Sequence, residues 1–86
     1  MYNLLYKKSV EKELRNLPHK TRVAVVRKIQ ALAKDPRPNG HVKLRGSTNL
    51  YRIRYTDYRI IYSVDSGELI ILVIKVAHRK EVYRDF

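Results

Sequence analysis

Several residue types that carry chemistry or cross-links are missing from this sequence or rare in it. The 86 residues include no cysteine, so the chain can form neither a disulfide nor a thiolate site. A cysteine-free chain fits a reducing compartment, and we expect a cytoplasmic protein. The three histidines, at positions 19, 41 and 78, lack metal-ligand spacing, and the acidic residues are dispersed. We therefore expect neither a metal nor another cofactor.

Long apolar segments are missing as well. The longest run, residues 69–74, has the length of a strand and falls far short of the roughly 18 residues that cross a membrane. The first residues become charged too early for a signal peptide. A chain of 86 residues has the size of one domain, so we expect a single soluble domain over residues 1–86 with no membrane partner.

Acidic residues are few compared with basic ones. The 19 lysines and arginines outnumber the 8 aspartates and glutamates, which gives a net charge of +11 and an isoelectric point near 10.2. The natural partners of such a chain are polyanions: a nucleic acid, an acidic protein or an anionic surface. Charge alone predicts binding and not chemistry, so a nonspecific polyanion binder stays open.

Hydrophobic periodicity predicts two helices in the first half of the chain. Residues 7–16 repeat their apolar positions every three or four residues, and Pro18 ends this helix. Residues 19–34 form the second helix, which the prolines and glycine of residues 35–40 stop. The apolar stripe of the second helix is predicted at Val26, Ile29 and Ala33, with Val25 and Leu32 beside it.

The other segments alternate with a period of two, which predicts strands. The candidates are residues 1–6, 41–46, 49–55, 58–64 and 68–77. The order β-α-α-β-β-β-β predicts the α+β class, with two N-terminal helices packed on one face of a small, mostly antiparallel sheet. Residues 69–77 are apolar at both parities, so we expect a central strand covered on both faces. Residues 78–86 are expected to form a tail or a helical turn.

The segment "YRIRYTDYRIIY", residues 51–62, reads as a hairpin with arginines on one face. If the central Thr-Asp pair forms the loop, Arg54 lies opposite Arg59, and Arg52 shares their face. Opposed like charges cost the sheet up to about 1 kcal/mol. One explanation is a solvated face whose charges block edge pairing. The concentration of arginine favours the other explanation, a bound anion and most simply a phosphate.

Three further candidates follow the last strand at its C-terminal end: His78, Arg79 and Tyr83. Tyr83 taken alone is explained equally well by packing. His78 taken alone fits a surface or capping histidine better than a catalyst. For Lys43 and Arg45 in the segment "KLRG", a plain basic loop is the alternative explanation.

Four segments occur in an order and spacing that resemble the RelE/ParE superfamily of bacterial toxins: "VKLRG", "YRIRYTDYRIIYSV", an apolar strand and "VAHRKEVY". More narrowly, the chain resembles the RelE-type messenger-RNA endonucleases of toxin–antitoxin pairs. This resemblance covers essentially the whole chain and implies the fold described above. It also implies a toxin that enters the ribosomal A site and cuts messenger RNA there without a metal, by attack of an RNA 2′-hydroxyl on the adjacent phosphate. The implied partners are the ribosome with its messenger RNA and a cognate antitoxin, in a toxin–antitoxin hetero-oligomer.

The resemblance assigns residues to the site. The matching positions are Arg52 and Arg54 on the first hairpin strand, Arg59 on the second, Arg79 and Tyr83 in the C-terminal segment, and Arg45 in the "KLRG" loop. Lys43, two residues before Arg45, is expected to contact RNA as well. Such a cleavage needs a base for the 2′-oxygen, stabilisation of a charged phosphorane and neutralisation of the leaving 5′-oxygen.

The hairpin arginines suit the phosphorane, and Arg79 suits the leaving oxygen. The paired positions of the first hairpin strand are lysines in the best-known family member, whereas Arg52 and Arg54 stay charged and cannot exchange protons. The acid/base role therefore falls on Tyr83, whose tyrosinate form nearby arginines favour, or on His78, because histidine as a residue type is suited to acid/base catalysis. Two other functions stay open: a ParE-like inhibitor of DNA gyrase without chemistry of its own, and an inactive RNA-binding module.

Overall fold

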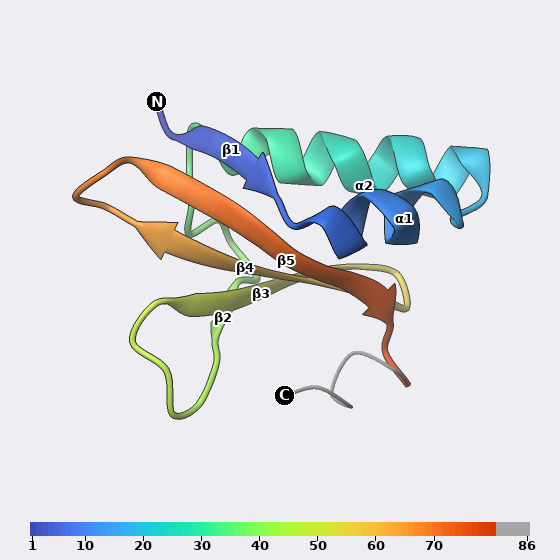
Figure 1. Ribbon diagram of the computed structural model, residues 1–86. Coiled ribbons are helices and arrows are strands. Elements are labelled where there is room, and N and C mark those ends of the chain that lie inside the picture. The colour runs from blue at the N-terminus through green and yellow to red at the C-terminus, as the bar shows by residue number, and fades with distance from the viewer. Residues whose placement is uncertain (81–86) are drawn as a thin grey trace.

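The computed structural model describes residues 1–80, in which two helices lie against one face of a five-stranded sheet (Figure 1). The elements are β1 (Asn3–Tyr6), α1 (Lys8–Arg15), α2 (His19–Ala31), β2 (Val42–Lys43), β3 (Leu50–Tyr55), β4 (Tyr58–Asp65) and β5 (Ile70–His78). This order and layering confirm the predicted α+β class. No helix within residues 1–80 is long and apolar enough to cross a membrane.

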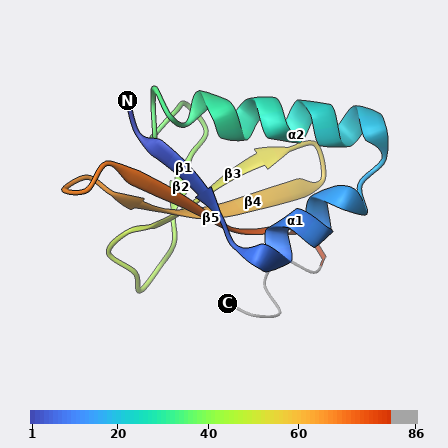
Figure 2. The ribbon, with the colours of Figure 1, turned by 45° about the horizontal axis from the view of Figure 1, so that its top comes forward.

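The sheet has the strand order β1-β5-β4-β3-β2. Only the β1–β5 pair is parallel, and the other three pairs are antiparallel, which confirms a mostly antiparallel sheet. The first and the last strand of the chain therefore lie side by side, as Figure 2 shows. This pairing holds β5 between β1 and β4, in the interior of the sheet.

Helix α2 buries a stripe that differs slightly from the predicted one. Val25, Ile29 and Leu32 are fully buried, whereas Val26 and Ala33 are half-buried. The helix thus rotates its buried face by one position towards Val25. The prediction was right about the set of apolar residues and wrong about which of them lie at the centre of the stripe.

Helix α2 also ends earlier than predicted, at Ala31 instead of Lys34. The chain tightens after this residue, because the amides of Leu32 and Ala33 donate to carbonyl groups three residues back. The carbonyl oxygen of Ala33 then accepts the amide of Tyr2 at 2.9 Å. The end of the helix is in this way joined to the start of the chain.

The sheet face under the helices forms the main core. Its buried residues on β3, β4 and β5 are Tyr51, Ile53, Ile60, Tyr62, Val64, Ile71, Val73 and Val76. The opposite face carries a small second cluster, in which Ile61 and Ala77 are buried and Leu44 and Ile74 pack against them. The prediction that both faces of β5 are covered is therefore only partly right. Within residues 1–80, the helices cover one face, and this small cluster covers only part of the other.

Strand β2 is much shorter than the predicted strand at residues 41–46. Only Val42 and Lys43 pair with β3, opposite Arg52 and Tyr51. The residues just before β2 form a turn, in which the His41 amide donates to the Pro38 carbonyl oxygen at 3.0 Å and Gly40 adopts a φ of 89°, which is easy for glycine alone. Because β2 and β3 are antiparallel, this turn lies at the Arg52 end of β2, and no strand within residues 1–80 pairs with the outer edge of β3 beyond Arg52.

Candidate functional site

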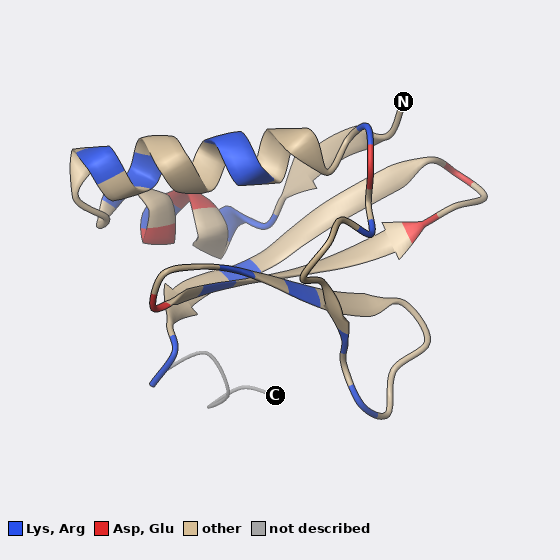
Figure 3. Cartoon of the chain, turned by 180° about the vertical axis from the view of Figure 1, so that it is seen from behind, with Lys and Arg blue, Asp and Glu red and all other residues tan. Residues whose placement is uncertain are grey.

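The hairpin of β3 and β4 has the register that the sequence predicts. Arg54 lies directly opposite Arg59. Thr56 in the loop adopts a φ of 50°, in the left-handed region that two-residue hairpin loops use and that residues other than glycine rarely adopt. Arg52, Arg54 and Arg59 therefore share the sheet face that points away from the helices, and Figure 3 shows basic segments along both strands of this hairpin.

The guanidinium of Arg59 is held against the hairpin loop. Its Nη1 atom donates to the carbonyl oxygen of Thr56 at 3.3 Å and to that of Tyr58 at 3.4 Å. A guanidinium has five N–H donors in a rigid fork, so Arg59 keeps donors for an anion while its position is restrained. Arg52 is half-buried and Arg54 is exposed. Of the three arginines, Arg59 is therefore restrained by the loop and Arg54 is exposed to solvent.

Arg79 lies at the loop end of the same face. Its backbone amide donates to the carbonyl oxygen of Asp57 at 2.7 Å, and its Nε atom is 3.8 Å from Oδ1 of the same aspartate. The two side chains are 58% and 61% exposed, so this ion pair orients Arg79 without removing it from solvent. Sequence reasoning treated Asp57 as a loop residue only. The available signal was that it is the one acidic residue between Leu50 and Val64.

His78 lies on the other face of the sheet. It pairs with Tyr58, and the two rings meet edge to face with centroids 5.7 Å apart. Because Tyr58 belongs to the same set of alternate residues as Ile60, the His78 side chain is directed to the helix side. The structure thus brings Arg79 to the three hairpin arginines and does not bring His78 to them.

A bulge in β5 decides which of these two residues joins the arginines. Ile61 pairs with Lys75 but Tyr62 pairs with Val73, so Ile74 is an extra residue in β5. Without the bulge, a regular strand would place Lys75 among the core residues. The charged Lys75 in an otherwise apolar run was the sequence signal for this bulge, which the sequence analysis did not predict.

Glu13 on helix α1 holds the strand just after the bulge. Its Oε1 atom accepts the amide of Val76 at 3.0 Å, and its Oε2 atom lies 3.6 Å from the Nζ atom of Lys75. Strand β1 covers the edge of β5 only as far as Val73, and α1 continues beyond it. Glu13 therefore fixes the register of the last residues of β5, and Arg79 with them. Sequence reasoning missed this residue.

The remaining predicted residues lie at the margin of the site or beyond it. Lys43 pairs with Tyr51, so alternation directs it to the face opposite Arg52. Arg45 is exposed in the turn before Gly46. Tyr83 lies outside the described residues. Within residues 1–80, no three histidine, aspartate or glutamate side chains gather where they could hold a metal ion.

Two tyrosines on the helix side hold the chain after α2 against the sheet. The Tyr62 hydroxyl donates to the Pro36 carbonyl oxygen at 2.7 Å, and burial raises the pKa of Tyr62 to about 12. The Nε atom of Arg37 donates to the Tyr51 hydroxyl at 3.1 Å, and this hydrogen bond raises the pKa of Arg37. These contacts fix residues 36–40 beside β3.

The fold and the arginine-bearing face define a class: a small α+β protein that presents clustered guanidinium groups on an open sheet face. The family model described as the ParE toxin of type II toxin–antitoxin systems, parDE, matches residues 4–83, and the chain belongs to this family. The resemblance to the RelE/ParE superfamily is thereby confirmed, and the chain is a toxin of a toxin–antitoxin system.

Relatives and solved structures agree with this assignment. A protein named RelE1 from Methanocaldococcus jannaschii is 29% identical over 87 residues, which cover 98% of this chain and 97% of the relative. The RelE–RelB complex from Pyrococcus horikoshii matches with a TM-score of 0.82 and 32% identity, over 93% of this chain and 97% of that chain. The isolated RelE toxin of E. coli matches with a TM-score of 0.81 and 29% identity, over 91% of this chain and 84% of that chain.

Proposed function

We propose that this toxin is a ribosome-dependent endoribonuclease that cuts messenger RNA in the ribosomal A site without a metal. One observation carries the proposal: Arg54 and Arg59 lie directly opposite each other, and Arg79 is held at the loop of the same hairpin. Opposed cations cost stability, so a face that keeps them is best explained by a bound polyanion. The RelE names of the relatives support RNA as that polyanion.

The chemistry follows from what each group can do. Attack by the 2′-oxygen forms a bond to phosphorus, breaks the bond to the 5′-oxygen, and leaves a 2′,3′-cyclic phosphate and a 5′-hydroxyl. The arginines Arg52, Arg54 and Arg59 bind the phosphorane, whose negative charge grows in the transition state. Arg79 stabilises the negative charge on the leaving 5′-oxygen, which takes the proton of the 5′-hydroxyl from water.

Tyr83 is the proposed base for the 2′-hydroxyl proton. His78 was the alternative, and its place beside Tyr58 on the helix side makes it the weaker candidate. If Tyr83 is the base, Tyr83→Phe removes far more activity than His78→Ala. The reverse order would transfer the role to His78.

The experiment is primer extension on a messenger RNA translated in a purified system, with analysis of the new 3′ ends. Cuts at the A-site codon that end in 2′,3′-cyclic phosphate and need ribosomes are the expected result. Arg59→Ala should reduce the cleavage rate at least about 100-fold, the usual loss when one preorganised donor to a transition state is removed. Arg15→Ala, the same change at an exposed residue of α1, is the matched control. Wild-type cleavage by Arg59→Ala would refute the site.

The description of the family as ParE toxins favours a second candidate, a gyrase inhibitor that performs no chemistry. DNA supercoiling by gyrase in the presence of this protein separates the two candidates. If the protein stopped supercoiling and made no ribosome-dependent cuts, the gyrase inhibitor would replace the endoribonuclease as the proposed function. Tight, salt-sensitive RNA binding without either effect would leave an inactive RNA-binding module.

We also propose that a cognate antitoxin binds this chain in a toxin–antitoxin complex. The support is that solved relatives are RelE–RelB complexes from several organisms, among them Pyrococcus horikoshii, E. coli and Mycobacterium tuberculosis. The charge of +11 favours an acidic partner and a fast, salt-dependent association with it.

A further inference from the structure

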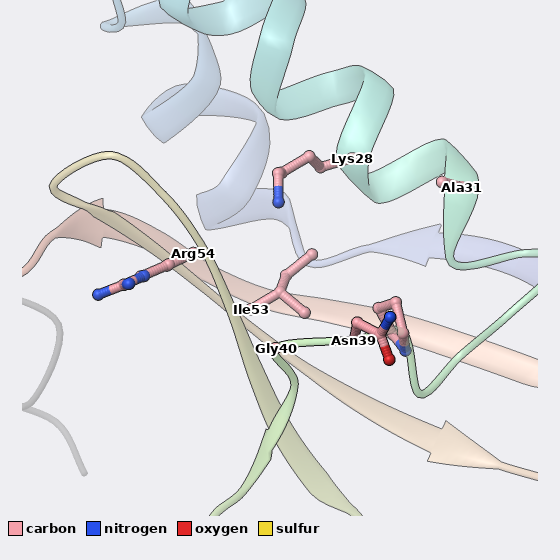
Figure 4. A pocket seen from close by; sticks show the side chains of 7 residues that line it. Lys28, Ala31, Asn39, Gly40, Ile53 and Arg54 are labelled. Carbon is pink, nitrogen blue, oxygen red and sulfur yellow. The ribbon is translucent and has the colours of Figure 1, made fainter.

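The arginine face is the side of the β3–β4 hairpin that carries Arg52, Arg54 and Arg59. On the other side of β3, Ile53 lies below Lys28 of α2 and lines a hollow of about 250 Å³ (Figure 4). The guanidinium of Arg54 extends away from this hollow in the same view, and the side chain is exposed. An anion that approaches the arginine face is therefore met by the hairpin and not by helix α2.

A carboxylate stands at the loop end of the arginine face. The register that pairs Tyr58 with His78 brings Asp57 opposite Arg79, one residue further out. Asp57 precedes Arg59 by two residues, so alternation places both side chains on the same face. The other acidic residues within residues 1–80 lie on α1, in the loop after α2 and around the turn between β4 and β5 (Figure 3). In this part of the chain, Asp57 is thus the one negative charge on the arginine face.

The backbone and the side chain of Asp57 do different things for Arg79. The Asp57 carbonyl oxygen accepts the Arg79 amide at 2.7 Å, and this bond holds the backbone whatever the side chain is. The carboxylate lies 3.8 Å from the Arg79 Nε atom, and both side chains are more than half exposed. Exposed ion pairs of this length are weak. The carboxylate therefore orients and neutralises the guanidinium but is easily displaced from it.

A phosphate can take the place of this carboxylate. Guanidinium groups bind phosphate through two parallel hydrogen bonds, which is a stronger contact than a single ion pair at 3.8 Å. Until that exchange takes place, the carboxylate competes for Arg79 and repels any phosphate near the loop. The affinity of the arginine face for RNA is consequently lower than its guanidinium groups alone would give.

Such a penalty has a use in a chain with a net charge of +11, because excess positive charge binds RNA without regard to sequence. In the proposed reaction, the ribosome holds the messenger RNA where the toxin binds. The effective concentration of phosphate at the site is then high, and it overcomes the competition from the carboxylate. Free RNA lacks this advantage.

We propose that Asp57 is a specificity-determining residue that acts as an internal counterion of Arg79. Its carboxylate occupies Arg79 in the free toxin, and an RNA phosphate displaces it. The displacement lowers the affinity for free RNA and so keeps the toxin selective for RNA that the ribosome presents. This inference rests on the proposed function, because it takes RNA as the anion of the arginine face.

The first test measures binding of a fluorescently labelled, 2′-O-methylated single-stranded RNA, which lacks the attacking hydroxyl and stays uncut. Asp57→Asn should bind it about three- to tenfold more tightly than the wild-type chain at low salt. The plot of log affinity against log salt should steepen by about 0.7, the value for one more phosphate contact on a single strand. The control is Glu68→Gln, which removes one negative charge at an exposed residue of the β4–β5 turn.

Circular dichroism verifies that both variants are folded. Unchanged affinity and slope in Asp57→Asn, or an equal gain in the control, would overturn the proposal. If the wild-type chain and Asp57→Asn both bound no RNA, the arginine face would not be an RNA site, and the proposed function would fall as well.

The second test asks whether the carboxylate acts through Arg79. In an Arg79→Ala background, Asp57→Asn should give a smaller gain in RNA affinity, since no guanidinium is left to release. The remaining gain reports the general repulsion between the carboxylate and phosphate. An equal gain in the two backgrounds would show that Asp57 does not act as the counterion of Arg79.

The third test measures selectivity in the ribosome-dependent cleavage assay, with the 2′-O-methylated RNA as a competitor. Each variant is compared with its own rate without competitor. Asp57→Asn should reach half of that rate at about three- to tenfold less competitor than the wild-type chain. Slower cleavage by Asp57→Asn with unchanged binding of free RNA would place Asp57 in the chemistry and overturn the proposal. Tighter RNA binding by Asp57→Asn, with no cleavage by the wild-type chain, would support the counterion and refute the endoribonuclease.

Discussion

The two faces of strand β4 differ sharply near the hairpin loop, at Arg59 and Ile60. Ile60 is fully buried under the helices and pairs with Ile53, which is 4% exposed. Arg59 points to the other side and pairs with Arg54, which is exposed. Neighbouring residues of the strand thus belong to two different cross-strand pairs. The isoleucine pair stabilises the sheet, and the arginine pair destabilises it.

This difference separates the face that stabilises the fold from the face that we propose binds RNA. On the helix face, each large aliphatic side chain contributes roughly 1.5–3 kcal/mol through burial, and no polar side chain is buried among residues 1–80. On the outer face, opposed arginines cost up to about 1 kcal/mol. The helix face therefore provides the stability with which the hairpin tolerates a concentration of positive charge.

The largest expected effect contrasts Ile60→Ala with Arg59→Ala. Ile60→Ala should lower the free energy of unfolding by about 2–5 kcal/mol, because it leaves a cavity in the main core. Arg59→Ala should change it by no more than about 0.5 kcal/mol, as exposed-face substitutions do. Urea denaturation measures both values. A large loss from Arg59→Ala would mean that the arginine face is structural.

An effect of intermediate size concerns alkaline pH. Tyr62 keeps its proton in the folded chain up to about pH 12, whereas an unfolded tyrosine loses it near pH 10. The unfolded chain therefore binds fewer protons above pH 10, and stability present below pH 10 is lost as the pH rises towards 12. The difference between the folded and the unfolded pKa of this tyrosine corresponds to about 3 kcal/mol in the free energy of unfolding.

Thermal unfolding between pH 9 and pH 12 measures this loss. Tyr62→Phe should make stability depend less on pH in that window. Part of the dependence should remain, because burial also raises the pKa of Tyr6. If the stability of Tyr62→Phe depended on pH between pH 9 and pH 12 as strongly as that of the wild-type chain, Tyr62 would not be the buried, neutral group responsible.

The smallest expected effect is a gain of stability on the outer face. Arg54→Thr removes one of two opposed cations and places a good strand former in β3, so unfolding should cost up to about 1 kcal/mol more. The gain should shrink at high salt, where charges are screened. Arg45→Thr, in a turn without an opposed arginine, is the control. Urea denaturation at two salt concentrations would show destabilisation if Arg54 were structural.

Local pattern was enough to predict the hairpin and the helices. The alternation of residues 51–62 fixes which side chains share a face, and a two-residue loop then leaves one register that pairs Arg54 with Arg59. The same reasoning placed α1 and α2, although the stripe of α2 was off by one position. For the site, the sequence predicted the arginines and their common face.

Features that depend on distant residues could not be predicted in this way. The bulge at Ile74 is settled by Glu13, which lies more than sixty residues away in sequence and accepts the amide of Val76. Asp57 was read as a loop residue because its partner, Arg79, is adjacent only after β4 and β5 pair. The shortness of β2 likewise depends on the turn at residues 38–41, just before the strand. The role of Tyr83 stays a prediction.

The bulge in β5 has a chemical meaning as well as a structural one. If β5 paired with β4 as a regular strand, one residue out of its present register, His78 would face Asp57 and Arg79 would turn to the other side. One sequence can therefore present either an imidazole or a guanidinium at the same place beside the hairpin arginines. Glu13, a residue of a helix on the far side of the sheet, selects the group that never gives up its proton.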